Sequence, residues 1–80
     1  MHSRGMPQFY FDKVVNGQTV HDDVGIELAS LEMARHKALC TAAEIAREAT
    51  ARGELSEICV KVRVGGIEPI AVARLSMEMK

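Results

Sequence analysis

The residues most able to bind a metal ion lie in and after the first predicted hairpin: Asp12, His21, Asp22 and Asp23. Carboxylate oxygens are the ligands that hard divalent cations prefer. The same side chains have structural uses, because Asp12 and His21 suit a cross-strand pair and aspartates beside a glycine shape turns. We favour the structural interpretation, and we predict no metal site and no cofactor.

A second candidate for chemistry is the pair His36 and Cys40, which lie four residues apart and therefore on one face of a helix. An imidazole at this spacing can activate a thiolate. A flat helix surface offers neither a pocket nor oxyanion donors, so we favour a solvated surface. Cys40 and Cys59 match no zinc-binding spacing. We predict that they are free thiols, because the helix and the sheet would lie between them.

No arrangement typical of an enzyme is found in the sequence. There is no Ser/His/Asp or Cys/His motif, and Gly65-Gly66 joins two predicted strands without opening a helix, which argues against a phosphate-binding loop. The chain has 80 residues, of which 48% are hydrophobic and 26% charged, as in one globular domain. Its net charge of -1 gives no general support to nucleic-acid binding. We predict a protein that is not an enzyme.

The ends of the chain and its apolar segments bear on its location. No segment has the apolar length of a membrane-spanning helix, and residues 1–5 lack the apolar stretch of a signal peptide. We expect residues 1–5 to be a disordered extension and residues 6–80 to form a single domain. Free thiols suit a reducing compartment. The expected location is the cytoplasm, with no membrane partner.

A hairpin is predicted at the start of the domain. Residues Gln8 to Val15 are rich in aromatic and β-branched side chains and end at Asn16-Gly17, the dipeptide that type I′ turns prefer. A second strand covers Gln18 to His21, and the two-residue turn pairs Lys13 with Val20. The expected core face of the hairpin carries Phe9, Phe11, Val15 and Val20. The expected solvated face carries Tyr10, Asp12, Thr19 and His21.

One helix and a second hairpin complete the predicted domain. The helix covers Leu31 to Arg52, with Ser30 as its N-cap and Gly53 just beyond its end. Its apolar stripe is mostly alanine (Leu31, Ala34, Ala38, Ala42, Ile45 and Ala49), with Leu39 and Ala46 at its edge. The last two strands are expected at Glu57–Val64 and Pro69–Met79. Together these elements predict a ββαββ α+β fold, with one helix on one face of a four-stranded, mainly antiparallel sheet of strand order 2-1-3-4.

Several short motifs resemble those of a family of small uncharacterised domains common in alphaproteobacteria. The likeness rests on the opening strand Phe9-Tyr10-Phe11-Asp12, the turn Asp22-x-x-Gly25 and the alanine-rich helix that starts at Leu31. It extends over nearly the whole chain from Met6. The chain departs from the pattern at residues 64–67, where the family usually has an acidic turn. The resemblance implies this fold in a bacterial cytoplasm, and it implies no activity.

One face of the sheet is not covered by the helix and is the candidate interaction surface. We expect it to carry Tyr10, Asp12, His21, Lys61, Arg63, Ile70, Val72 and Arg74. The last strand is apolar on both faces and lies at an edge, where unpaired backbone groups invite another strand. We therefore predict a protein-interaction module that forms a homodimer and buries Ile70 and Val72 between chains. A β-bulge that turns these two side chains inward is the competing explanation.

The alternative function is an antitoxin-like or regulatory module that binds nucleic acid. An aromatic residue beside three basic residues on an open sheet is typical of platforms that bind single-stranded RNA. The domain also has a loose, fold-level likeness to HicB-type antitoxins. Acidic residues among the basic ones, and the presence of one aromatic residue only, make this alternative less favoured than the interaction module.

Overall fold

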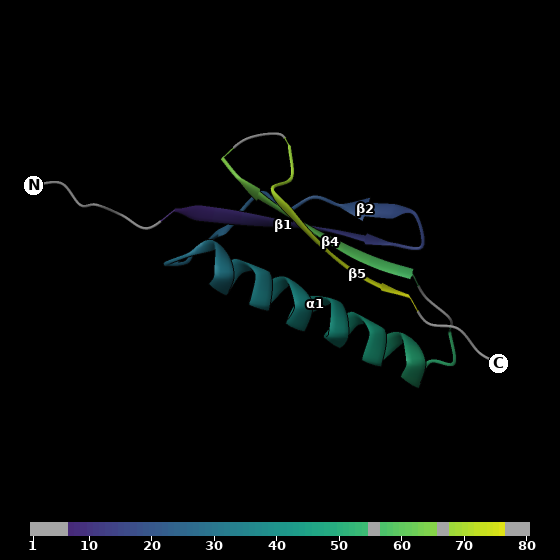
Figure 1. The fold of residues 1–80 in the computed structure, drawn as a ribbon. Coiled ribbons are helices and arrows are strands. Elements are labelled where there is room, and N and C mark those ends of the chain that lie inside the picture. Colours follow the sequence, from purple (N-terminus) through teal and green to yellow (C-terminus); the bar gives the residue numbers. More distant parts are fainter. Residues whose placement is uncertain (1–6, 55–56, 66–67, 77–80) are drawn as a thin grey trace, which may run out of the picture.

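A computed structural model describes residues 7–54, 57–65 and 68–76 of the chain. Within these ranges a single helix lies against one face of an antiparallel sheet (Figure 1). The elements in chain order are β1 (Gln8–Val15), β2 (Gln18–Val20), β3 (Ile26–Glu27), α1 (Leu31–Ala51), β4 (Glu57–Val64) and β5 (Ala71–Ser76). The predicted ββαββ α+β fold is confirmed, with β3 as a short addition. The predicted extension over residues 1–5 lies outside the described residues.

The strand order is β2-β1-β4-β5, which confirms the predicted order. The first hairpin also has the predicted register, with Lys13 opposite Val20 and Val15 opposite Gln18. Asn16 and Gly17 both have positive φ, of 51° and 85°, as a type I′ turn requires. The turn chemistry therefore decides which side chains of β2 lie opposite those of β1.

The strand β3 was not predicted, and it pairs with one end of the outer edge of β1. It pairs Ile26 with Phe9, whereas β2 pairs with Lys13, Val14 and Val15 at the other end of the same edge. The middle of β1 thus lacks a strand partner on this side. The carboxylate of Asp22 fills part of the gap, because it accepts a hydrogen bond of 3.0 Å from the backbone N–H of Phe11.

The helix begins and ends where its capping residues predict. The Ser30 hydroxyl accepts a hydrogen bond of 3.2 Å from the N–H of Met33, and Gly53 has a φ of 77° just beyond the C-terminus. The buried stripe of α1 consists of alanines: Ala34, Ala38, Ala42, Ala46 and Ala49. These small side chains let α1 pack closely on the sheet, against the fully buried Ile58, Val60 and Val62 of β4.

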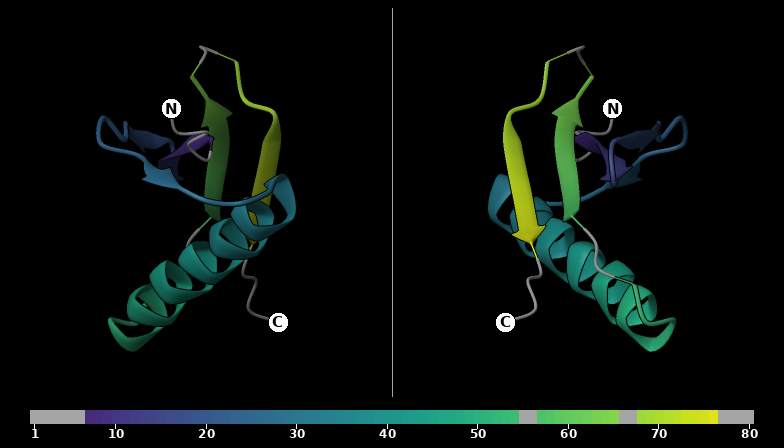
Figure 2. Two further views of the ribbon diagram at one scale, coloured as in Figure 1. Left: turned by 90° about the vertical axis from the view of Figure 1, so that its left-hand side faces the viewer. Right: turned by 90° about the vertical axis from the view of Figure 1, so that its right-hand side faces the viewer.

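The helix covers only some of the sheet, since it packs on β4 and β5 (Figure 2). The hairpin of β1 and β2 extends to one side of it. For this reason the prediction that Val20 belongs to the core is wrong: this side chain is 61% exposed, on an edge strand that α1 does not reach. Within the described ranges, no helix combines the length and the apolar character needed to cross a membrane.

The remaining differences concern the ends of elements. The second strand stops at Val20, one residue earlier than predicted, and α1 stops at Ala51. The last strand begins at Ala71, two residues later than predicted, and the N–H of Ile70 just before it donates a hydrogen bond of 2.8 Å to the Val62 carbonyl. The predicted continuation of this strand over residues 77–79 lies outside the described residues.

Candidate functional site

The sheet face turned away from α1, here called the open face, brings most of the predicted interaction residues together. Adjacent strands pair Tyr10 with Arg63, Asp12 with Lys61, and Lys61 with Val72, so these side chains share one face. Arg74 lies on the same face opposite Cys59. His21 follows β2 and reaches this face beside Asp12. The predicted face is therefore a continuous surface across β1, β4 and β5, with His21 at its margin.

The centre of this face is an ion pair between the buried Asp12 and the partly buried Arg63. Asp12 is only 4% exposed, and its carboxylate accepts hydrogen bonds of 2.7 and 3.1 Å from the Arg63 guanidinium and of 2.9 Å from the Asp22 backbone N–H. The predicted neighbour His21 is present, with Nδ1 at 3.3 Å from the carboxylate. The prediction of a solvated Asp12 is wrong, because Arg63 and the chain after β2 lie over it.

These contacts fix the charges of the pair. The hydrogen bond from Arg63 holds the pKa of Asp12 well below its usual range, against an opposing effect of burial, and the Asp22 backbone N–H and His21 assist. In return, the Asp12 carboxylate raises the pKa of Arg63. The guanidinium also lies over the Tyr10 ring, 5.0 Å from its centroid. Both charges are consequently used to join β1 to β4.

The loop that follows β2 is held by the second aspartate of the resemblance motif. The Asp22 carboxylate accepts hydrogen bonds from the backbone N–H groups of Phe11, Val24 and Gly25, at 3.0, 3.0 and 3.1 Å. Burial disfavours its charged form, but these three donors outweigh burial and lower the pKa of Asp22. The motif therefore has a structural role, since its aspartate substitutes for a missing strand and caps a turn.

Gly25 is required by the packing of the same loop. It has a φ of +76°, and a Cβ atom added to it would lie 2.8 Å from Cε2 of Tyr10. The aromatic ring is thus enclosed between the loop and Arg63. Tyr10, Asp12, Asp22 and Gly25, which carry the family resemblance, form one connected structural unit with Arg63.

Two of the three aspartates considered as metal ligands, Asp12 and Asp22, belong to this unit. The carboxylates of Asp12 and Asp22 face N–H donors, and Asp23 is exposed. Among residues 7–54, 57–65 and 68–76, no three His, Cys, Asp or Glu side chains come close enough to hold a metal ion together. The two cysteines are free thiols, as predicted, with Cys40 exposed and Cys59 half-buried.

A second surface surrounds the outer edge of β5. The sequence predicted Ile70 and Val72 as part of it, but not the neighbouring residues of α1. Ile70 and Val72 are 48% and 47% exposed, so the alternative that turned them inward is wrong for the single chain. Beside them, Leu39 of α1 is 57% exposed. A hollow of about 300 Å³ lies between helix and strand, and its lining includes Arg35, Leu39, Ile70 and Val72. The helical period placed Leu39 at the margin of the apolar stripe, but it did not show which strand that margin faces.

Comparison with known proteins identifies the family of the chain. A family model described as a domain of unknown function, DUF6894, matches residues 8–76, which include every strand and the helix. No curated protein and no solved structure matches the chain. The matched segment contains the whole unit formed by Tyr10, Asp12, Asp22, Gly25 and Arg63. The chain belongs to the DUF6894 family of domains of unknown function.

Proposed function

We propose that this domain is a non-catalytic interaction module that self-associates, with β5 of two copies pairing edge to edge. The observation that supports this proposal most strongly is the outer edge of β5, which is flanked by exposed apolar side chains. Val72 lies on the open face of this edge, and Leu39 and Ile70 line the hollow beside it. Apolar groups on both sides of a strand edge favour the addition of another strand.

The two edges of the sheet differ in how well they are protected. The strand β2 has only three residues, and short edge strands resist pairing with other chains. The strand β5 has six residues without a proline, and Arg74 is its only charged residue. The sheet is consequently protected at β2 and open to pairing at β5.

The position of α1 supports the same interface. Because α1 packs on β4 and β5, a sheet continued through β5 would bring the helices of two copies side by side. Strands about 4.8 Å apart would place the two helix axes about 10 Å from each other, which is the ordinary distance of packed helices. Leu39 faces this side and would be buried between the helices.

The positions of these side chains along α1 and β5 predict how β5 of one copy aligns with β5 of the second copy. Leu39 and Val72 line the same hollow, so a two-fold axis through Val72 also passes near Leu39. This register places Val72 opposite Val72 of the second copy and Ala71 opposite Ala73. Arg74 lies opposite Ile70, which keeps like charges from facing each other directly. In this register the β5 edges of two copies can therefore pair without placing like charges of the strand directly opposite each other.

Nucleic-acid binding through the open face has weaker support. Arg63 is paired with Asp12, and its guanidinium covers the Tyr10 ring on which a base would stack. Lys61 and Arg74 form no ion pair within the described ranges, and two cations per copy give little phosphate neutralisation. The geometry favours self-association over the antitoxin-like alternative.

Sedimentation equilibrium at micromolar concentration tests the proposal. The parent chain should have the mass of a dimer, and Val72→Lys should convert it to a folded monomer. Val20→Lys is the matched control, since Val20 is an exposed valine on the opposite edge strand. A monomeric parent, or a dimer that survives Val72→Lys, would contradict the proposal. Salt-dependent binding of mixed oligonucleotides by a monomeric parent would favour the alternative.

A further inference from the structure

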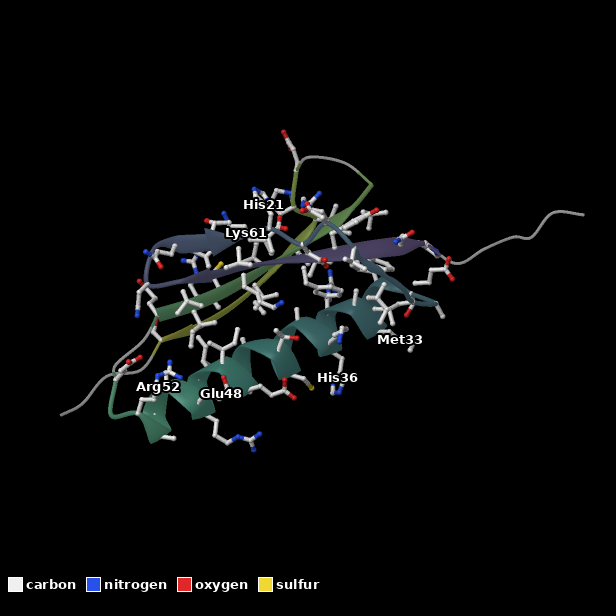
Figure 3. The ribbon with its side chains drawn as sticks, turned by 180° about the vertical axis from the view of Figure 1, so that it is seen from behind. His21, Met33, His36, Glu48, Arg52 and Lys61 are labelled. Carbon is white, nitrogen blue, oxygen red and sulfur yellow. The ribbon has the colours of Figure 1, made fainter. Side chains whose placement is uncertain are left out.

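The open face of β4 and β5 carries two cations that the ion pair of Asp12 and Arg63 does not use. Alternate residues of β4 are buried against α1, so Lys61 lies on the side of the sheet away from the helix (Figure 3). Arg74 of β5 lies on the same side, opposite Cys59. Lys61 and Arg74 are both exposed, and neither forms an ion pair with another described residue. Both charges are therefore available to a partner.

The register of the sheet explains why Lys61 has no counter-charge of its own. Its cross-strand neighbours on this face are Asp12 of β1 and Val72 of β5. The Asp12 carboxylate instead accepts hydrogen bonds of 2.7 and 3.1 Å from Arg63, two residues further along β4. The acid opposite Lys61 is thus already paired, and the charge of Lys61 remains.

The spacing of the two cations suits two carboxylates of one extended chain. Arg74 is level with Cys59, and Lys61 lies two residues further along β4, so Lys61 and Arg74 are diagonal neighbours with Cβ atoms about 7 Å apart. In an extended peptide, residues at alternate positions share one face and are also separated by about 7 Å. Two glutamates at alternate positions can therefore each meet one of the cations.

The surface beside the two cations has room for such a chain. A hollow of about 270 Å³ lies over the strands, and its lining includes Val14, Cys59, Lys61, Arg74 and, at the start of β4, Glu57. The partly apolar floor weakens the screening of charges above it. The hollow is open to solvent rather than enclosed. A small molecule would bury too little of its surface there, whereas a peptide also makes contacts beyond the hollow.

We propose that this part of the open face binds an extended acidic segment of another protein, with carboxylates at alternate positions paired to Lys61 and Arg74. Nucleic acid is the less suitable partner, because the Arg63 guanidinium covers the Tyr10 ring on which a base would stack. The surface lies within one chain, so this binding does not require the pairing of β5 with a second copy.

NMR titration of the full chain with a capped peptide that repeats Ser-Glu tests this proposal. The backbone N–H signals of Cys59, Lys61 and Arg74 should shift as the peptide is added, and those of α1 should not. Lys61→Gln and Arg74→Gln should each weaken binding about threefold, as expected for the loss of one exposed ion pair. Glu57→Gln should strengthen binding about twofold, because it removes a like charge from the hollow. Binding should weaken as the salt concentration rises.

Arg47→Gln is the matched control, since Arg47 is an exposed cation of α1 and its substitution changes the net charge equally. It should leave binding unchanged. All four variants replace exposed residues and should keep the dispersed NMR spectrum of the parent, which excludes unfolding as the cause of weaker binding.

Four results would overturn the acidic segment as the partner. They are a parent chain whose signals do not shift, equal weakening by Arg47→Gln and Lys61→Gln, equal binding of an uncharged peptide that repeats Ser-Gln, and tighter binding of a mixed single-stranded oligonucleotide at the same residues. The last result would assign this surface to nucleic acid.

Discussion

Arg63 on β4 holds the carboxylate of Asp12 on β1 by two hydrogen bonds, of 2.7 and 3.1 Å, at a position where Asp12 is almost completely buried. The carboxylate also accepts a backbone N–H from Asp22, the residue that organises the following loop. One charged group thus connects two strands and a loop, so changing it should affect the whole sheet.

Replacing Asp12 by Asn should destabilise the domain by about 2 kcal/mol, because it removes a charged acceptor of several hydrogen bonds and leaves the guanidinium without its counter-charge. Urea denaturation with equal m-values measures the change. The matched control is Asp23→Asn on the exposed neighbouring loop position, which should change the free energy of unfolding very little. Equal effects of the two substitutions would contradict the importance of the ion pair.

The free energy of unfolding should fall in acid. Both Asp12 and Asp22 have a folded-state pKa below their ordinary value of 3.8. Carboxylates of this kind stabilise the fold fully above the unfolded pKa and lose that contribution as pH falls toward the folded pKa. The loss should begin near pH 4 and continue below it, and Asp12→Asn should make it shallower. An acid profile of Asp12→Asn as steep as the parent's would refute this assignment.

Gly25→Ala should cost more stability than an equivalent change elsewhere. Both Gly25 and Gly53 have positive φ, of +76° and +77°, but only at Gly25 would the new methyl group meet another atom, Cε2 of Tyr10 at 2.8 Å. Backbone strain of about 1 kcal/mol is common to both substitutions. Thermal melts should show a clearly larger decrease for Gly25→Ala, and equal decreases would mean that the ring moves aside freely.

Leu39→Glu should weaken self-association by about tenfold or more, equivalent to about 1.4 kcal/mol, because it places a charge between the two helices. Met33→Glu is the control, since Met33 is 50% exposed on α1 but is not among the residues that line the hollow beside β5. Concentration-dependent light scattering gives the dissociation constants. Equal effects of the two changes would place the interface elsewhere.

The sequence predicted the elements whose signals are local. The Asn16-Gly17 turn determined the register of the first hairpin, and Ser30 and Gly53 marked the ends of α1. Alternation in β4 gave its bounds without error. Each of these features depends on neighbouring residues, which is why a single sequence was sufficient.

Features that depend on distant residues were not predictable in the same way. The burial of Asp12 needs Arg63, 51 residues later, together with the loop at Asp22. The exposure of Val20 depends on where α1 crosses the sheet, and hydrophobic periodicity does not contain that information. The residues on which the family resemblance was based likewise form a structural unit, so the resemblance implied no activity.

Cysteine cross-linking at Val72 is a direct test of the proposed pairing of β5 with β5 of a second copy. Val72→Cys in a background of Cys40→Ser and Cys59→Ser should form a covalent dimer rapidly under mild oxidation, because opposed residues in paired strands have Cβ atoms about 5 Å apart. Val20→Cys in the same background should cross-link slowly. Equal cross-linking rates at the two positions would contradict the pairing of β5 with itself.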